Sequence, residues 1–192
     1  MLTPSKPQLT SQKGCDVNQI SRNDAIYKLC KKKLSSLDTE SRESYILDWW
    51  GIDEDDVEFS SLSAELQRQM LANEDPPNDS ENYKYDELII IALSAEFKGV
   101  TNAFLAENMI TMGVGTYKVC GELEPLEICP CCEYRTLNSR GDYEICRLCN
   151  WEDNGADQLE QYSGPNHMTL GEAKKQFSEN MGSLPLGKWM NA

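Results

Sequence analysis

Two Cys-x-x-Cys pairs that lie close together constrain this fold more than any other feature of the sequence. The first is Cys129-Pro130-Cys131-Cys132, the second is Cys146-Arg147-Leu148-Cys149, and 13 residues separate them. Each such turn lets two sulfurs converge on one tetrahedral ion. The stretch between them is long enough for a hairpin that returns the second pair to the first, with strands at 134–137 and 142–145. The spacing therefore predicts a small zinc ribbon with one structural Zn²⁺ held by Cys129, Cys132, Cys146 and Cys149.

Other interpretations of these cysteines are less consistent with the spacing. Four unrelated buried thiols rarely fall into two pairs at hairpin separation, and a thioredoxin-like redox pair should open a helix after a strand. Cys131 is an alternative ligand to Cys132, but only Cys132 gives both halves the same two-residue gap. Arg147 is expected near the sulfurs, where its charge would offset part of the negative charge of a four-thiolate centre. Three cysteines have no partner at ligand spacing and are expected to be core or surface thiols: Cys15, Cys30 and Cys120.

A centre with four protein ligands has no open position for water or substrate, which makes it a folding site and not a Lewis-acid catalyst. The chain has a single histidine, His167, in a Gly-Pro-Asn-His loop. A loop-fixing or exposed role is expected for it, because Ser163 and Cys131 are only nominal nucleophiles beside it. We therefore expect a protein that is not an enzyme.

Charge limits the partners of this chain of 192 residues. Its 18 basic residues stand against 32 acidic ones, for a net charge of −14. Direct binding of nucleic acid is not expected, because phosphate contacts need Lys and Arg; a basic partner is the natural complement. No apolar run approaches the roughly 20 residues of a membrane span, and the N-terminus lacks the apolar core of a signal peptide. We expect a cytoplasmic protein without membrane contacts.

Helical periodicity and capping signals indicate an α+β chain in three parts. Residues 1–20 are expected to be a flexible N-terminus, and 21–114 a helical domain. Residues 115–192 are expected to form the zinc-ribbon β module, beginning with a short strand around 117–119 and ending in a C-terminal helix. The expected helices cover residues 22–35, 39–51, 60–71, 85–98, 101–113 and 169–180.

A dense acidic run follows the second expected helix. Between Asp38 and Glu58 there are nine acidic residues and one basic residue, Arg42. The run lacks the Gly and the alternating oxygen ligands of a calcium loop. It is either a solvated loop or a docking surface for a basic partner, and the clustering favours docking. The candidate partner-binding residues are Asp53, Glu54, Asp55, Asp56 and Glu58.

The first cysteine pair, the segment Cys146-x-x-Cys149-x-Trp151-Glu152-Asp153-x-Gly155 and the segment Gly164-Pro165-Asn166 resemble the bacterial CPCC-type cysteine-rich family. The resemblance covers residues 126–180, and the stretch 98–102 resembles longer members that carry a helical domain. Two positions depart from the pattern: Glu133 stands where Gly is usual, and Arg147 where Pro is frequent.

The resemblance implies a small accessory protein, and a number of such proteins resemble immunity proteins encoded beside bacterial toxins. Nuclease toxins are typically basic, so an acidic inhibitor complements them. The expected function is therefore an immunity protein that binds and blocks a cognate, basic toxin. The alternative is an intracellular zinc-ribbon adaptor that binds a component of transcription or translation. A basic toxin-like reading frame beside the gene would discriminate between the two.

Overall fold

The computed structural model describes residues 18–76 and 78–192, so most of the segment expected to be a flexible N-terminus, together with Cys15, lies outside the described residues. The mixture of helices with small strand pairs that the sequence predicts is confirmed. The boundaries drawn at 20/21 and 114/115 remain predictions. In the described ranges no helix has the length and apolar content needed to cross a membrane.

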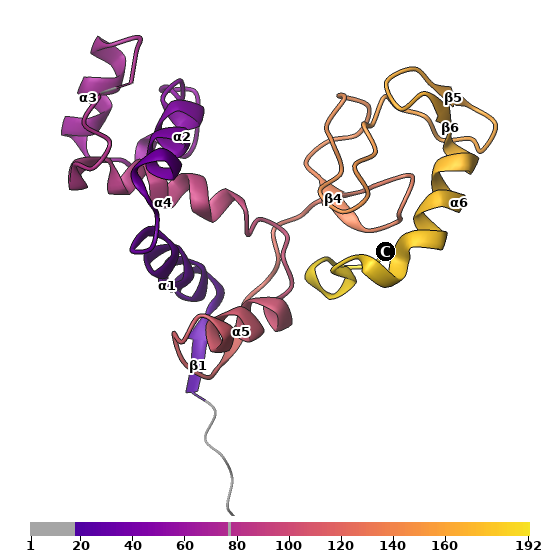
Figure 1. Ribbon diagram of the computed structural model, residues 1–192, viewed down its shortest axis with the longest axis horizontal. Coiled ribbons are helices and arrows are strands. Elements are labelled where there is room, and N and C mark those ends of the chain that lie inside the picture. Colours follow the sequence, from indigo (N-terminus) through magenta and orange to yellow (C-terminus); the bar gives the residue numbers. More distant parts are fainter. Residues whose placement is uncertain (1–17, 77) are drawn as a thin grey trace, which may run out of the picture.

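Five α-helices form the first lobe, at the indigo to magenta end of the chain (Figure 1). Side-chain caps at Ser21, Asp38 and Thr101 start three of them within one residue of the expected first positions. The helices are α1 (Arg22–Leu34), α2 (Thr39–Trp49), α3 (Ala64–Ala72), α4 (Asp86–Ala95) and α5 (Asn102–Thr111), with short 3-10 turns η1 (Phe59–Ser61) and η2 (Tyr83–Tyr85).

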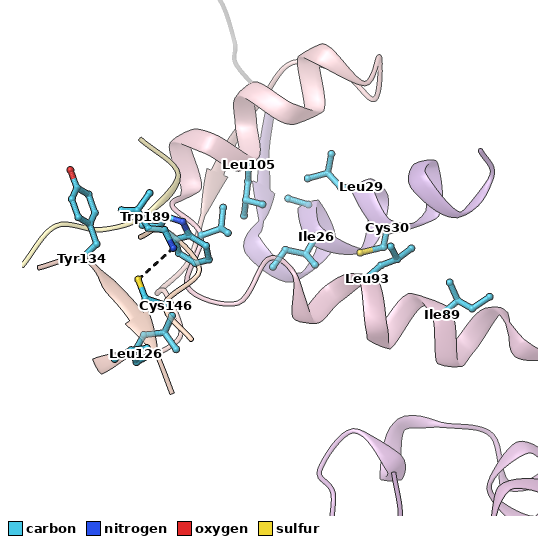
Figure 2. Packing of buried hydrophobic residues seen from close by; sticks show 14 of the residues in the cluster. Ile26, Leu29, Cys30, Ile89, Leu93, Leu105, Leu126, Tyr134, Cys146 and Trp189 are labelled. Atoms are coloured by element: carbon cyan, nitrogen blue, oxygen red, sulfur yellow. Dashed lines mark hydrogen bonds between the residues drawn. The ribbon is translucent and has the colours of Figure 1, made fainter. Parts of the chain in front are cut away.

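The third helix begins later than its sequence pattern suggests. Leu62 and Ser63 have extended backbone, so the chain breaks between η1 and α3. The hydroxyls of Ser60 and Ser61 donate to the carbonyls of Val57 and Glu58, which favours the separate turn over a continuous helix. Fully buried side chains of α1, α4 and α5 form the centre of this lobe, among them Leu29, Leu93 and Leu105 (Figure 2).

Residues 18–20, which were expected in the flexible N-terminus, form a strand instead. Strand β1 (Asn18–Ser21) pairs in parallel with β2 (Tyr117–Cys120), and Ile20 lies opposite Val119. Both of these side chains are buried. Strand β2, which the sequence assigns to the zinc module, is thus paired with the start of the helical lobe.

The second lobe contains Cys129, Cys132, Cys146 and Cys149, two antiparallel strand pairs and one helix; Figure 1 shows it at the orange to yellow end of the chain. Strand β3 (Glu127–Ile128) pairs with β4 (Arg135–Leu137), and β5 (Tyr162–Ser163) pairs with β6 (Met168–Thr169). Helix α6 (Leu170–Asn180) opens with a capping box of Thr169 and Glu172, within the range expected for the last helix. The chain then passes through the turns η3 (Met181–Ser183) and η4 (Leu186–Lys188).

The loop 98–102 joins the two lobes. Thr101 N–H donates to the Lys188 carbonyl at 2.9 Å, and Val100 forms a β-bridge with Trp189. Gly99 has φ +75°, and a Cβ there would lie 2.1 Å from Cδ1 of Leu126. Only glycine permits both this backbone conformation and this approach. The loop is therefore a tight contact between the helical lobe and the C-terminal segment.

An ion pair between a buried arginine and a partly buried glutamate reinforces that junction. The Arg22 side chain is 3% exposed and donates from Nε and Nη2 to both carboxylate oxygens of Glu124, at 2.9 and 2.6 Å. It also donates to the carbonyls of Phe97 and Val100 and to Asn102 Oδ1. Because Glu124 lies in the connection to the cysteines, Arg22 links the first helix to the second lobe.

Candidate metal centre

The first cysteine turn, Cys129–Glu133, lies between β3 and β4. Cys129 N–H donates to the Tyr134 carbonyl at 2.9 Å, and Glu133 N–H donates back to the Cys129 carbonyl at 2.9 Å. Glu133 has φ 65°, in the left-handed region that glycine adopts without cost. This explains why Gly is usual at that position in the family that the sequence resembles.

The second cysteine turn, Cys146–Asn150, repeats this backbone arrangement. Cys146 N–H donates to the Trp151 carbonyl at 2.8 Å, and Asn150 N–H donates to the Cys146 carbonyl at 2.9 Å. Asn150 has φ 60°. Each pair of cysteines therefore lies in its own tight turn, with one left-handed residue directly after the second cysteine.

The hairpin predicted between 134–137 and 142–145 is wrong. Strand β4 pairs with β3, and Ile145 forms a bridge with Glu152. The stretch between the two cysteine turns is held by side chains: Glu144 accepts from Asn138 N–H at 2.6 Å, and Asp153 accepts from Gly141 N–H at 2.8 Å. The spacing requires the chain to return from the first cysteine pair to the second. In the structure it does so through a loop held by side-chain hydrogen bonds, and each cysteine turn has a short antiparallel pairing of its own.

The four predicted ligands lie together. The sulfurs of Cys129, Cys132, Cys146 and Cys149 are all within 4.8 Å of one another. Two of the distances are 3.6 Å, between Cys129 and Cys149, and 3.7 Å, between Cys132 and Cys146. A tetrahedral ion with Zn–S bonds of about 2.3 Å places its sulfurs roughly 3.8 Å apart. The cluster therefore fits a four-sulfur metal ion, and its geometry is compatible with zinc.

Hydrogen bonds around Cys146 favour a negative charge on its sulfur. The neighbouring thiols of Cys129, Cys132 and Cys149 hold the pKa of Cys146 far below its usual range. The Thr136 hydroxyl lies 3.0 Å from the same sulfur, and the Leu148 N–H donates to it at 3.4 Å. Such donors offset the charge that a four-thiolate centre concentrates. Sequence reasoning did not select Thr136, which is fully buried.

Cys131 is outside the four-sulfur cluster. It holds the same place in the first turn as Leu148 in the second, and each is 5% exposed. Because Leu148 is apolar, this position of the turn suits a buried side chain, such as that of Cys131. Arg147, expected near the sulfurs, donates from Nη1 to the Ala95 carbonyl at the end of α4, at 3.1 Å.

Two cysteines that the sequence assigned to the core or surface are found there. Cys30 is buried 3.5 Å from the Ser94 hydroxyl, and burial raises the pKa of its thiol. Cys120 is at the end of β2 and is partly exposed.

Asp153 belongs to the motif that resembles the CPCC-type family, and its structural role was not predicted from the sequence. Its side chain is fully buried, and it accepts from Nε of Arg140 at 2.7 Å. Together with the bond from Gly141 N–H, this pair closes the loop between the cysteine turns onto the segment that follows Trp151. A carboxylate directly after a Trp-Glu pair is the only signal that could have identified it.

The predicted partner-binding residues lie on the other lobe. The run Asp53–Glu58 follows α2, and its carboxylates are exposed. Figure 1 shows α2 and α3 far from α6. His167 is exposed and has φ 55° in its loop, which agrees with the loop role expected of it.

Residues 127–184 match the family Cysteine-rich CPCC. The CPCC match begins at β3, contains all four clustered cysteines and extends past α6; the helices α1–α5 precede it. No curated protein and no solved structure matches the chain.

The left-handed backbone at Glu133 should lower the stability of the protein, and replacing this residue tests that cost. Glu133→Gly is expected to stabilise the protein by about 1 kcal/mol, because a side chain in this conformation costs roughly that much. The substitution also removes the ion pair with Lys174, but Glu133 is 65% exposed and such pairs contribute little. Urea unfolding of the metal-loaded protein measures the change.

Glu133→Gln is the matched control, because it removes the charge and keeps the side chain. It should leave stability nearly unchanged. Both variants lack the ion pair with Lys174, so their difference reports the backbone cost alone. If Glu133→Gly is no more stable than Glu133→Gln, the left-handed conformation costs nothing here and the prediction is wrong.

Proposed function

We propose that this protein is an immunity protein that binds and neutralises a cognate toxin, a basic nuclease domain, and that one zinc ion on Cys129, Cys132, Cys146 and Cys149 stabilises its second lobe. The proposal assigns no reaction to the protein. Four sulfur ligands around one ion leave no coordination position for a substrate. We place it in the bacterial cytoplasm, where a toxin with a nucleic-acid target would act.

The acidic run is the observation that carries this proposal. Its five carboxylates are exposed, and none forms an ion pair with a residue in 18–76 or 78–192. The run is nevertheless ordered locally: Asp53 N–H donates to Asp56 Oδ2 at 3.0 Å, and Asp55 N–H donates to Asp53 Oδ1 at 2.9 Å.

Val57, in the middle of the run, is 83% exposed. Unpaired charges around an exposed apolar side chain suit a basic surface with an apolar contact.

The test begins with any basic reading frame encoded beside the gene. The two purified proteins are mixed and the dissociation constant is measured, and cells that produce the toxin domain are compared with and without this protein. The proposal requires tight binding and survival. A neighbour that neither binds nor harms cells, together with stable binding to RNA polymerase or the ribosome, would support the adaptor alternative.

The acidic run itself is tested by changing Asp53, Asp55 and Asp56 to Asn. The affinity for the toxin is expected to fall by about 1 kcal/mol or more, mostly through slower association at low salt, because opposite charges accelerate encounter. Metal content and thermal stability should be unchanged, since these side chains are exposed. Stopped-flow association at two salt concentrations measures the effect.

The control removes the same three charges at exposed positions elsewhere, with Glu107→Gln, Glu160→Gln and Glu179→Gln. If both triple variants slow association equally, the run is not a specific docking surface and only net charge matters.

A further inference from the structure

A groove of about 390 Å³ lies where the two lobes meet. One side is formed by the ends of α2 and α4, with Tyr45, Trp49 and Glu96. The other side is formed by the second cysteine turn and η4, with Arg147, Lys188 and Trp189. The groove is therefore complete only when the second cysteine turn and the C-terminal segment are both folded.

Two basic side chains, Arg147 and Lys188, line this groove together with two carboxylates, Asp48 and Glu96. Neither Arg147 nor Lys188 forms an ion pair within the described residues. Glu96 is already engaged, because its carboxylate accepts from Lys33 Nζ at 2.7 Å and from the Tyr45 hydroxyl at 2.7 Å. Asp48 is the other carboxylate in the lining. Arg147 and Lys188 thus have no carboxylate bound to them.

The two basic side chains also repel each other. Burial lowers the pKa of Lys188, and although Glu96 opposes this, the charges of Arg147 and Lys33 lower that pKa further. An anion in the groove would relieve this repulsion. The net charge of −14 does not prevent this, because distant surface charges are screened beyond about 8 Å at physiological salt.

Aromatic rings supply flat apolar surface to the same groove. Tyr45 and Trp49 are partly buried. Trp189 is 3% exposed, and its Nε1 has no hydrogen-bond partner in the described residues. Rings and cations in one groove favour a ligand that combines an anionic group with a flat body, since aromatic stacking and charge pairing then act together.

We propose that this groove binds a small ligand that carries an anionic group on a flat aromatic body, such as a nucleoside monophosphate. Arg147 and Lys188 bind the anionic group, and Trp49 and Tyr45 contact the ring. The site is independent of the acidic run and of toxin binding.

Calorimetric titration of the metal-loaded protein tests the proposal with three probes: adenosine monophosphate, adenosine and inorganic phosphate. Adenosine monophosphate is expected to bind with a dissociation constant below about 1 mM. Adenosine and phosphate should each bind at least tenfold more weakly, because each lacks one half of the ligand. If phosphate or adenosine binds as tightly as adenosine monophosphate, the two-part site is wrong. If adenosine monophosphate does not bind, the groove is not a binding site for this class of ligand.

Variants locate the binding. Lys188→Gln and Arg147→Gln should each weaken the binding of adenosine monophosphate at least tenfold. Trp49→Leu should also weaken the binding of adenosine monophosphate but leave the affinity for phosphate unchanged. Lys28→Gln, at an exposed position of α1, removes the same charge and should have no effect. Thermal unfolding and metal content verify that each variant is folded. Unchanged affinity in folded Lys188→Gln and Arg147→Gln would refute the assignment.

Discussion

Cys146→Ser is expected to empty the metal centre and to unfold the second lobe. Cys146 is fully buried, its sulfur is 3.7 Å from that of Cys132, and the second cysteine turn is built on its backbone. Three remaining thiols bind an ion far more weakly, and in small zinc modules the binding free energy of about 10 to 16 kcal/mol is also folding free energy. Elemental analysis should fall from about one zinc per chain to a small fraction, with loss of dispersed amide signals from residues 127–184.

Cys131→Ser is the matched control for this experiment. It changes a buried cysteine in the same segment, but one that lies outside the four-sulfur cluster. Zinc should stay near one per chain. If Cys131→Ser empties the site and Cys132→Ser does not, the ligand assignment is wrong and the first turn has a different register.

The second large effect is expected at the junction of the lobes. Arg22→Met should destabilise the protein by about 3 kcal/mol, because the carbonyls of Phe97 and Val100 lose their hydrogen-bond donor. The carboxylate of Glu124, which is 32% exposed, also loses its cation. Urea unfolding followed by circular dichroism measures the loss.

Arg68→Met, at an exposed position of α3, is the control and should change stability by less than about 0.5 kcal/mol. Equal losses in the two variants would show that the buried network contributes nothing specific.

The same pair predicts a dependence on pH. Burial raises the pKa of Glu124, but the bonds from Arg22 and from Gly99 N–H outweigh it, so the pKa is lowered overall. A lowered folded-state pKa means that the stabilisation is fully present above the unfolded value of about 4.3 and is lost as pH falls through the folded value. The stability difference between the native protein and Glu124→Gln should therefore shrink below pH 4.

Local signals in the sequence were sufficient for much of this protein. The caps at Ser21, Thr101 and Thr169 start helices because each side chain bonds a backbone amide three residues away, which needs no distant partner. The two Cys-x-x-Cys pairs likewise identified the four clustered sulfurs, since each turn brings its own two together. The acidic run could be recognised from its residue types alone, and its side chains are exposed in the structure, as expected for adjacent charged residues.

Tertiary structure alone decided how these parts are joined. The pairing of β1 with β2 joins residues 18–21 to 117–120, and no local pattern specifies a contact over that separation. The same holds for Arg22 with Glu124, and for Arg147 with Lys188 in the groove. The two cysteine turns close on themselves, so spacing predicted the ligands but not the hairpins. Periodicity and caps report interactions within a few residues, whereas burial of a charge or a strand edge depends on which distant segment covers it.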